Sequence, residues 1–244
     1  MIQYKEKRMN LFQLNEYFYQ LPGNAFLGLE EKKQADEVRR EVVKKNWIRS
    51  ASREYKVDEF RIEQGKLQLG EYKISIDFIE DEIFHDIISI MVFLITICEE
   101  DNFVIQDKEI EHKGRMYYET YYEVQKEASI SVMEQYYQSM WMYSALQAYR
   151  DELVKGYKDQ ILGPGYFGMP IEENESIYML LKGNQIGVTL HASCQFTPEN
   201  TICGIACKVG DHKKRWDEFV SNPCRTCIAT NKACGYCTFK KKRK

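Results

Sequence analysis

Residues 87–98 read IISIMVFLITIC, the longest apolar stretch of the chain. The stretch is well short of the roughly 20 residues that a membrane-spanning helix needs. Its β-branched residues favour a buried strand instead. We therefore predict that this segment is the central strand of an antiparallel sheet, and we expect no membrane-spanning segment.

The sequence before this strand favours short strands joined by tight turns. Residues 59–78, EFRIEQGKLQLGEYKISIDF, alternate apolar and polar side chains and are interrupted by Gly65 and Gly70. This pattern is typical of consecutive β-hairpins. We predict that the hairpin strands, within Tyr55–Phe78, belong to the same sheet as the apolar run.

Helices are predicted before and after these strands. Apolar residues recur at helical spacing in residues 10–21, and a second, highly charged helix is expected from Leu29 to about Trp47. A long helix with one apolar stripe is predicted from Ser129 to Lys158. The remaining predicted elements are a helix over 171–181, strands over 185–193 and 201–209, and a helix over 213–220.

These elements predict an α+β fold, in which helices flank an antiparallel sheet and a small metal-binding tail follows. We expect a helical N-terminal extension over residues 1–50, the α+β domain over 51–220, and a cysteine-rich tail with a basic end over 221–244. A chain of 244 residues, 44% of them hydrophobic, can bury a substantial core.

The overall charge argues against nucleic acid as a partner. A formal net charge of -3 provides no broad cationic field. The first ten residues, MIQYKEKRMN, are charged and lack the apolar run and cleavage site of a secretory signal. We expect a cytoplasmic protein on this basis.

Four cysteines are concentrated near the end of the chain. The segment CRTCIATNKACGYC has the spacing C-x2-C-x6-C-x2-C, which provides two pairs of thiolates for one tetrahedral centre. We predict that Cys224, Cys227, Cys234 and Cys237 bind a metal. Zinc and an iron–sulfur cluster are both compatible with this spacing. The basic run that follows, KKKRK over 240–244, is either a solvated tail or a binding segment for an acidic partner.

The segment GPGYFGMP, residues 163–170, is too rich in Gly and Pro for regular structure. Its glycines would allow a ligand to approach the backbone closely, and Tyr166 could stack on or hydrogen-bond to that ligand. A tight packed turn is the alternative interpretation of the same residues.

Three segments together resemble a known family. The stretch GPGYFGMPIEENESIYMLL, the later stretch QIGVTLHASCQFTPENTICGIACKVG and the cysteine-rich end look like the activation domain of cobalamin-dependent methionine synthase. The likeness is closest to the freestanding bacterial proteins built on that domain. It implies the fold of that domain and a ligand site for S-adenosylmethionine.

The resemblance carries over to particular residues. Pro164, Gly165 and Tyr166 match the family's cofactor-binding loop, and Thr189 and Ser193 match polar positions on the strand that follows. The family generally has an Arg three positions before the Pro of this loop, where it contacts the cofactor's carboxylate. This chain has Ile161 there, which offers no comparable group.

The resemblance also implies a function. Members of the family return inactive cob(II)alamin to the catalytic cycle by one-electron reduction followed by methyl transfer. The chain is therefore expected to act as an accessory or reactivation factor for a corrinoid-dependent methyltransferase, and the resemblance implies an S-adenosylmethionine-dependent methyltransferase or reductase activity. An iron–sulfur cluster in the tail would pass electrons from a donor protein. The alternative is a zinc-binding module for protein or nucleic-acid interaction that keeps the fold without the chemistry.

Other reactive residues give no further site. The order of residues contains no Ser-His-Asp triad, phosphate-binding loop or dinucleotide motif, and the histidines are scattered. Cys194, Cys203 and Cys207 are expected to be small buried side chains.

Overall fold

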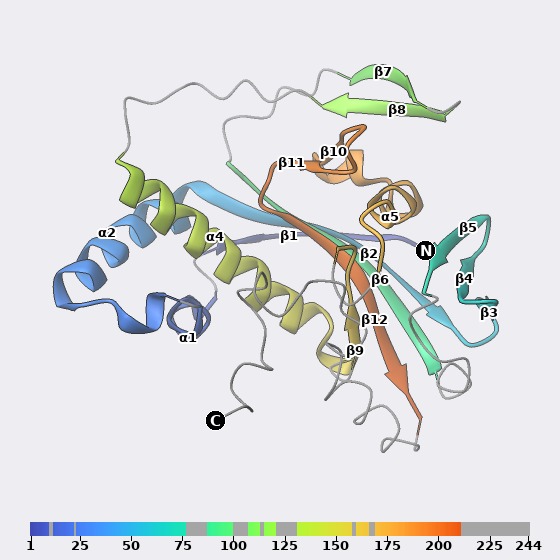
Figure 1. Cartoon of the computed structure of the whole chain (residues 1–244), viewed down its shortest axis with the longest axis horizontal. Coiled ribbons are helices and arrows are strands. Elements are labelled where there is room, and N and C mark those ends of the chain that lie inside the picture. Colours follow the sequence, from blue (N-terminus) through green and yellow to red (C-terminus); the bar gives the residue numbers. More distant parts are fainter. Residues whose placement is uncertain are drawn as a thin grey trace.

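The computed structural model describes residues 1–9, 12–21, 23–76, 87–99, 107–112, 115–120, 131–157, 160–165 and 169–210. A five-stranded antiparallel sheet runs through the centre of the molecule (Figure 1). Its strand order is β1 (Gln3–Arg8), β2 (Asn46–Lys56), β6 (Ile87–Glu99), β12 (Thr201–Val209) and β9 (Gln160–Leu162). The architecture is α+β, as predicted.

Strand β6 holds the central position that its apolar sequence predicts. It pairs with β2 from Asn46↔Glu99 to Lys56↔Ser89, and with β12 on its other edge. Its side chains alternate between two hydrophobic clusters: Val92 and Leu94 belong to one, and Phe93 and Ile95 belong to the other. The strand is apolar on both sides because both faces of the sheet are covered, and its Ser89 and Thr96 are buried polar exceptions.

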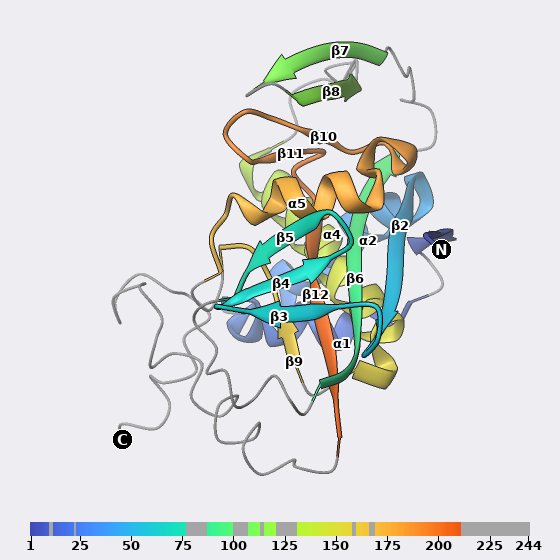
Figure 2. The same ribbon diagram turned by 90° about the vertical axis from the view of Figure 1, so that its right-hand side faces the viewer.

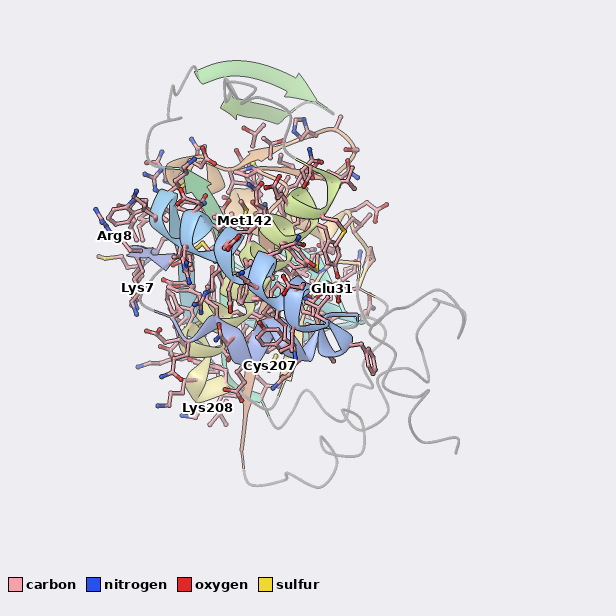
Figure 3. All side chains as sticks on the ribbon, turned by 90° about the vertical axis from the view of Figure 1, so that its left-hand side faces the viewer. Lys7, Arg8, Glu31, Met142, Cys207 and Lys208 are labelled. Atoms are coloured by element: carbon pink, nitrogen blue, oxygen red, sulfur yellow. The ribbon has the colours of Figure 1, made fainter. Side chains whose placement is uncertain are left out.

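One face of the sheet is covered by helices α1 (Leu14–Gln20), α2 (Leu29–Lys45) and α4 (Val132–Leu153). Figure 3 looks onto this side, with α2 in front. Trp141 of α4 is fully buried here, stacks on Phe18 with ring centroids 3.7 Å apart, and donates its Nε1–H to the Ala35 carbonyl at 2.8 Å. One aromatic side chain therefore joins all three helices.

The opposite face is covered by smaller elements (Figure 2). Helix α5 (Glu173–Leu181) lies beside a three-stranded sheet, and a short hairpin and a 3₁₀ turn η4 (Gly183–Ile186) complete the layer. The three strands are β3 (Arg61–Glu63), β4 (Lys66–Leu69) and β5 (Tyr72–Ser75), and the short hairpin is β10 (Thr189–Leu190) and β11 (Phe196–Thr197). A separate hairpin joins β7 (Asp107–His112) to β8 (Arg115–Thr120).

Two strand predictions need correction. The hairpins predicted within Tyr55–Phe78 exist, but they form their own sheet and pack on the central one instead of extending it. The predicted strand over 185–193 is mostly irregular: Gln185–Ile186 are the end of the turn η4, and only Thr189–Leu190 is extended. The turn η4 begins with Gly183 and is followed by Gly187, which adopts a φ of 79°, a conformation that favours glycine and ends the turn.

Residues 1–50 also contribute to the sheet. The structure has the predicted helices α1 and α2, and it adds the strands β1 and β2, which the sequence pattern does not predict; the predicted boundary at residue 50 lies inside β2. Ser50 and Ser52 of β2 are buried, and the Ser50 hydroxyl is 2.8 Å from that of Tyr149. Because these buried side chains are polar, the segment lacks the regular apolar pattern by which a buried strand is predicted from the sequence.

The helices are otherwise close to their predicted ranges. Helix α4 begins after Ser131, whose hydroxyl accepts the Glu134 N–H while the Glu134 carboxylate accepts the Ser131 N–H. This reciprocal pair is a capping box, and it fixes the start of the helix. No helix in the described part of the chain is long and apolar enough to cross a membrane. The helix predicted over 213–220 lies outside the described residues.

Candidate ligand site beside helix α5

The predicted ligand loop begins where β9 ends at Leu162. Pro164 is buried and Gly165 is exposed with a φ of 80°, a conformation that favours glycine. The Gly165 N–H donates to the Met169 carbonyl at 2.9 Å, so the two described ends of the loop are joined. Tyr166 lies outside the described residues, and its predicted role stays a prediction.

The first turn of α5 lies directly after this loop. The Glu173 N–H donates to the Pro170 carbonyl at 3.2 Å, and Glu173 Oε1 accepts the Ser75 N–H at 2.8 Å. Glu173 is only 8% exposed, and its Oε2 has no hydrogen-bond partner among the described residues. A buried carboxylate oxygen in this state is costly, so it is a candidate acceptor for a ligand donor.

Asn174 links α5 to two other elements. Its Nδ2 donates to the Cys194 carbonyl at 2.8 Å, and its Oδ1 accepts a hydrogen bond from Cys203 Sγ at 3.1 Å. The loop over 163–170 and the turn over 191–195 are therefore held against the same helix end. Sequence reasoning missed Glu173 and Asn174, although the acidic run EEN directly after Met169-Pro170-Ile171 was visible.

The other two predicted polar residues differ from each other in exposure. Thr189 is 2% exposed within β10, so it supports the hairpin more than it presents a hydroxyl to solvent. Ser193 is exposed, and its Oγ lies 3.4 Å from Gln195 Oε1. Within this turn the His191 Nε2 and Thr197 Oγ1 atoms are 2.7 Å apart. Of the predicted strand residues, Ser193 is the accessible one.

Ile161 and Leu162 face opposite sides of the central sheet. Leu162 packs in the cluster under α5, whereas Ile161 packs against the cluster under α4. Met169, at the far end of the loop, belongs to the α5 cluster. The side chain at position 161 therefore points to the face opposite α5.

Among the described cysteines, Cys194 and Cys207 are buried, as predicted, whereas Cys203, which was also predicted to be buried, is only partly buried. Desolvation raises the pKa of the Cys207 thiol to about 12 and also raises the pKa of Cys203. Protonated thiols are poor metal ligands and poor nucleophiles. The described residues contain no group of three or more His, Cys, Asp or Glu side chains that could hold a metal. The predicted ligands Cys224, Cys227, Cys234 and Cys237 lie outside them.

Comparison with known proteins shows the fold. No protein-family model matches the sequence, and a search of curated proteins finds no match. The structure is similar to the crystal structure of the MetH reactivation domain bound to AdoHcy, with a TM-score of 0.54 and 11% sequence identity. The match covers 86% of this chain and 79% of that chain. The fold that the resemblance implied is thus confirmed, while the freestanding form and the metal-binding tail stay predictions.

Proposed function

We propose that this protein is an accessory factor that supports reactivation of a corrinoid-dependent methyltransferase. The observation that carries the proposal is the fold, which resembles the MetH reactivation domain bound to AdoHcy over most of both chains. The loop with Pro164 and Gly165 and the turn with Ser193 converge on α5, which supports this region as the ligand site. A corrinoid-carrying protein is the proposed partner.

The groups at this site fit part of S-adenosylmethionine. The unpartnered Glu173 Oε2 can accept a hydrogen bond from an ammonium or hydroxyl group, and its charge suits a cationic ligand. A ligand carboxylate would need a cationic or N–H donor, and Ile161 supplies neither and faces the other side of the sheet. We therefore propose a site whose affinity depends on Glu173 and on the loop backbone.

For the tail, we propose that Cys224, Cys227, Cys234 and Cys237 hold an iron–sulfur cluster that receives electrons from a donor protein. Four thiolates satisfy such a cluster, and the cluster could supply the one-electron reduction that corrinoid reactivation requires. Zinc fits the same ligands but has no redox chemistry, so it would indicate an interaction module instead.

Anaerobic purification of the full chain tests the tail. Iron with acid-labile sulfide and visible absorbance that is bleached by dithionite supports the proposed cluster. Stoichiometric zinc in a colourless protein contradicts electron delivery and favours the interaction module. Replacing Cys227 with Ser should abolish metal content, whereas replacing the buried Cys207 with Ser should leave the metal content unchanged.

Calorimetric titration with S-adenosylmethionine tests the ligand site. Gly165→Ala places a Cβ at a φ of 80° in the loop and should weaken binding at least tenfold. Gly70→Ala is the matched control, because Gly70 has a φ of 65° in a turn of the small sheet and no atom within 4 Å of the new Cβ. No binding by the unmodified protein would remove methyl transfer from the proposal.

A further inference from the structure

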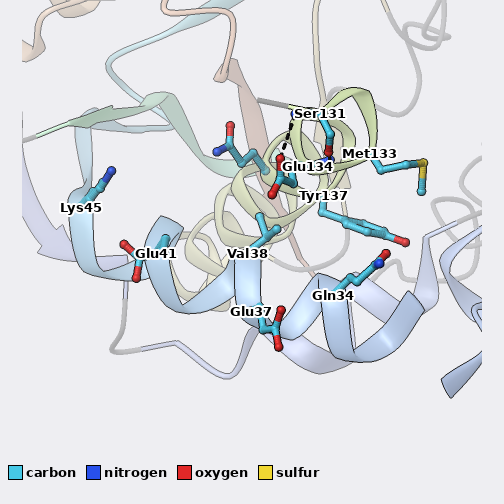
Figure 4. Close-up of a pocket in the computed structure, with 10 residues that line it drawn as sticks. Gln34, Glu37, Val38, Glu41, Lys45, Ser131, Met133, Glu134 and Tyr137 are labelled. Carbon is cyan, nitrogen blue, oxygen red and sulfur yellow. Dashed lines mark hydrogen bonds between the residues drawn. The ribbon is translucent and has the colours of Figure 1, made fainter. Parts of the chain in front are cut away.

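A hollow of about 670 Å³ lies between α2 and α4, on the side of the sheet opposite the Pro-Gly loop (Figure 4). Its walls carry Glu37 and Glu41 from α2 and Glu134 from the first turn of α4, together with Lys45. The proposed corrinoid function assigns no role to this hollow.

The hollow is negatively charged. Among the described residues, three carboxylates line it against one ammonium group, that of Lys45. Hydrogen bonds from Ser131 lower the pKa of Glu134, so this carboxylate is charged at neutral pH. A ligand for this surface would therefore carry positive charge.

A buried tyrosine at the hollow lacks a partner. Tyr137 is fully buried, and its ring lies between the two helices (Figure 4). Its hydroxyl has no hydrogen-bond partner among the described residues. Desolvation, with the nearby Glu31 carboxylate, raises the pKa of this phenol, so it remains a hydrogen-bond donor. Leaving a buried hydroxyl without an acceptor is costly, so the Tyr137 hydroxyl is a candidate hydrogen-bond donor to a ligand in the hollow.

Exposed apolar side chains surround this end of the helix pair. Met133 lines the hollow and is 47% exposed, and Val132 beside it is 81% exposed. Tyr136 donates to Asn24 Oδ1 at 2.8 Å, which places the highly exposed Phe26 at the same end. Charge and apolar surface thus occur together, as in sites that bind a basic segment with an aromatic anchor.

We propose that the chain's own C-terminal segment, Phe239–Lys244, binds in this hollow. Its sequence FKKKRK provides five consecutive cations and one aromatic side chain, which complement the carboxylates and the exposed Met133. The proposed cluster ligands begin at Cys224, so the tether that can extend is residues 211–223 after Gly210, the last described residue. Thirteen extended residues reach about 45 Å, well over the radius of gyration of about 18 Å expected for a chain of this length, so the tether permits the segment to reach the hollow. A backbone carbonyl of the bound segment would accept a hydrogen bond from the Tyr137 hydroxyl.

The test is competition between the tethered segment and the same sequence added as a peptide. A fluorescein-labelled FKKKRK peptide is titrated, with fluorescence anisotropy as the readout, into two full-length proteins: the unmodified chain and a variant with residues 240–244 all changed to Gln. We expect the peptide to bind the Gln variant at least tenfold more tightly, because the native tail no longer occupies the hollow at high effective concentration.

Substitutions then locate the binding surface in the Gln-tail background. Glu37→Gln combined with Glu41→Gln should lower the affinity for the peptide at least tenfold, and Tyr137→Phe should lower it about threefold. The control is Glu16→Gln with Glu30→Gln, which removes the same charge from exposed positions that do not line the hollow and should change the affinity less than twofold. Circular dichroism checks that each variant is folded.

Each other outcome overturns the proposal in an identifiable way. Equal peptide affinity for the unmodified and Gln-tail proteins would mean that the tail leaves the hollow free, and that a second molecule or another partner is its occupant. An equal loss of peptide affinity from the two pairs of glutamate substitutions would mean that the peptide is attracted non-specifically to an acidic surface. Metal content and S-adenosylmethionine binding are measured separately, so failure here leaves the proposed function standing.

Discussion

Replacing Gly204 with Ala should displace the strand that leads into the candidate ligand loop. Gly204 lies in β12 beside β9, and a Cβ added there would be 2.4 Å from the Leu162 carbonyl oxygen and 3.0 Å from Phe93 Cζ. Reaching the 3.4 Å of an ordinary contact requires β9 to move outward by about 1 Å. Backbone atoms cannot rotate away from such a contact, so β9 must move, and we expect Pro164 and Gly165, which follow it directly, to move with it.

The expected cost follows from the bonds that hold β9. The strand pairs with β12 over only Gln160–Leu162, and a shift of about 1 Å takes its N···O distances beyond hydrogen-bonding range. Losing about two such bonds costs roughly 1–3 kcal/mol. The higher strand preference of Ala over Gly returns about 0.5–1 kcal/mol. We expect the free energy of unfolding to fall by about 1 kcal/mol net, within a range of about 0–2.5 kcal/mol, and the melting temperature to fall by about 2–4 °C.

Urea unfolding followed by circular dichroism measures this cost, and hydrogen exchange should show faster exchange of the β9 amides. Gly156→Ala is the matched control, because its Cβ would have no atom within 4 Å. That variant should be neutral or more stable by up to about 1 kcal/mol. If the two variants have the same stability and the same exchange in β9, the reasoning about the close approach of the two strands is wrong.

Three further variants test contacts within the fold. Asn174→Ala removes two buried hydrogen bonds and should lower the free energy of unfolding by about 2–3 kcal/mol, measured by urea unfolding. Amide hydrogen exchange should increase more at residues 191–195 than elsewhere in the described chain. Trp141→Phe leaves the Ala35 carbonyl without its indole donor and should cost about 1–3 kcal/mol, whereas Trp47→Phe, at a partly exposed site, should cost less. Burial and the hydrogen bond to Glu54 raise the pKa of Tyr157 to about 12, so the folded state holds this proton more tightly than the unfolded state. Stability should therefore decline between about pH 10 and pH 12, and Tyr157→Phe should make that decline shallower; an unchanged slope would contradict this interpretation.

The parts of the fold that were predictable are those whose burial is uniform. The run over 87–98 is apolar on both faces because the sheet is covered on both sides, and α4 shows its apolar stripe and its capping residue Ser131. Strand β2 was not predictable in this way. Its buried Ser50 is satisfied by Tyr149, a residue far away in the sequence, so burial there depends on a partner that the local pattern does not reveal.

In the candidate site too, features set by neighbouring residues could be predicted, and features set by residues far apart in the sequence could not. The backbone conformation of Gly165 could be anticipated from the Pro-Gly sequence, because only local sterics are involved. The roles of Glu173 and Asn174 could not, since their partners lie on β5, on the turn over 191–195 and on β12. The hollow between α2 and α4 was hidden for the same reason, because its two walls lie about 90 residues apart in the chain.

The register of β9 explains why Ile161, which stands where the family motif has an arginine, affects both the packing of the sheet and the candidate ligand site. Ile161 pairs with Ala206 and packs towards α4, so its side chain stabilises the helical layer. An arginine here, with its backbone in the same place, would put a guanidinium among apolar side chains on the face away from the loop, where desolvation opposes it. The packing of this strand against the helical layer therefore favours an isoleucine at position 161 and disfavours an arginine. A carboxylate-bearing ligand would have to be held at this site by groups other than a side chain at position 161.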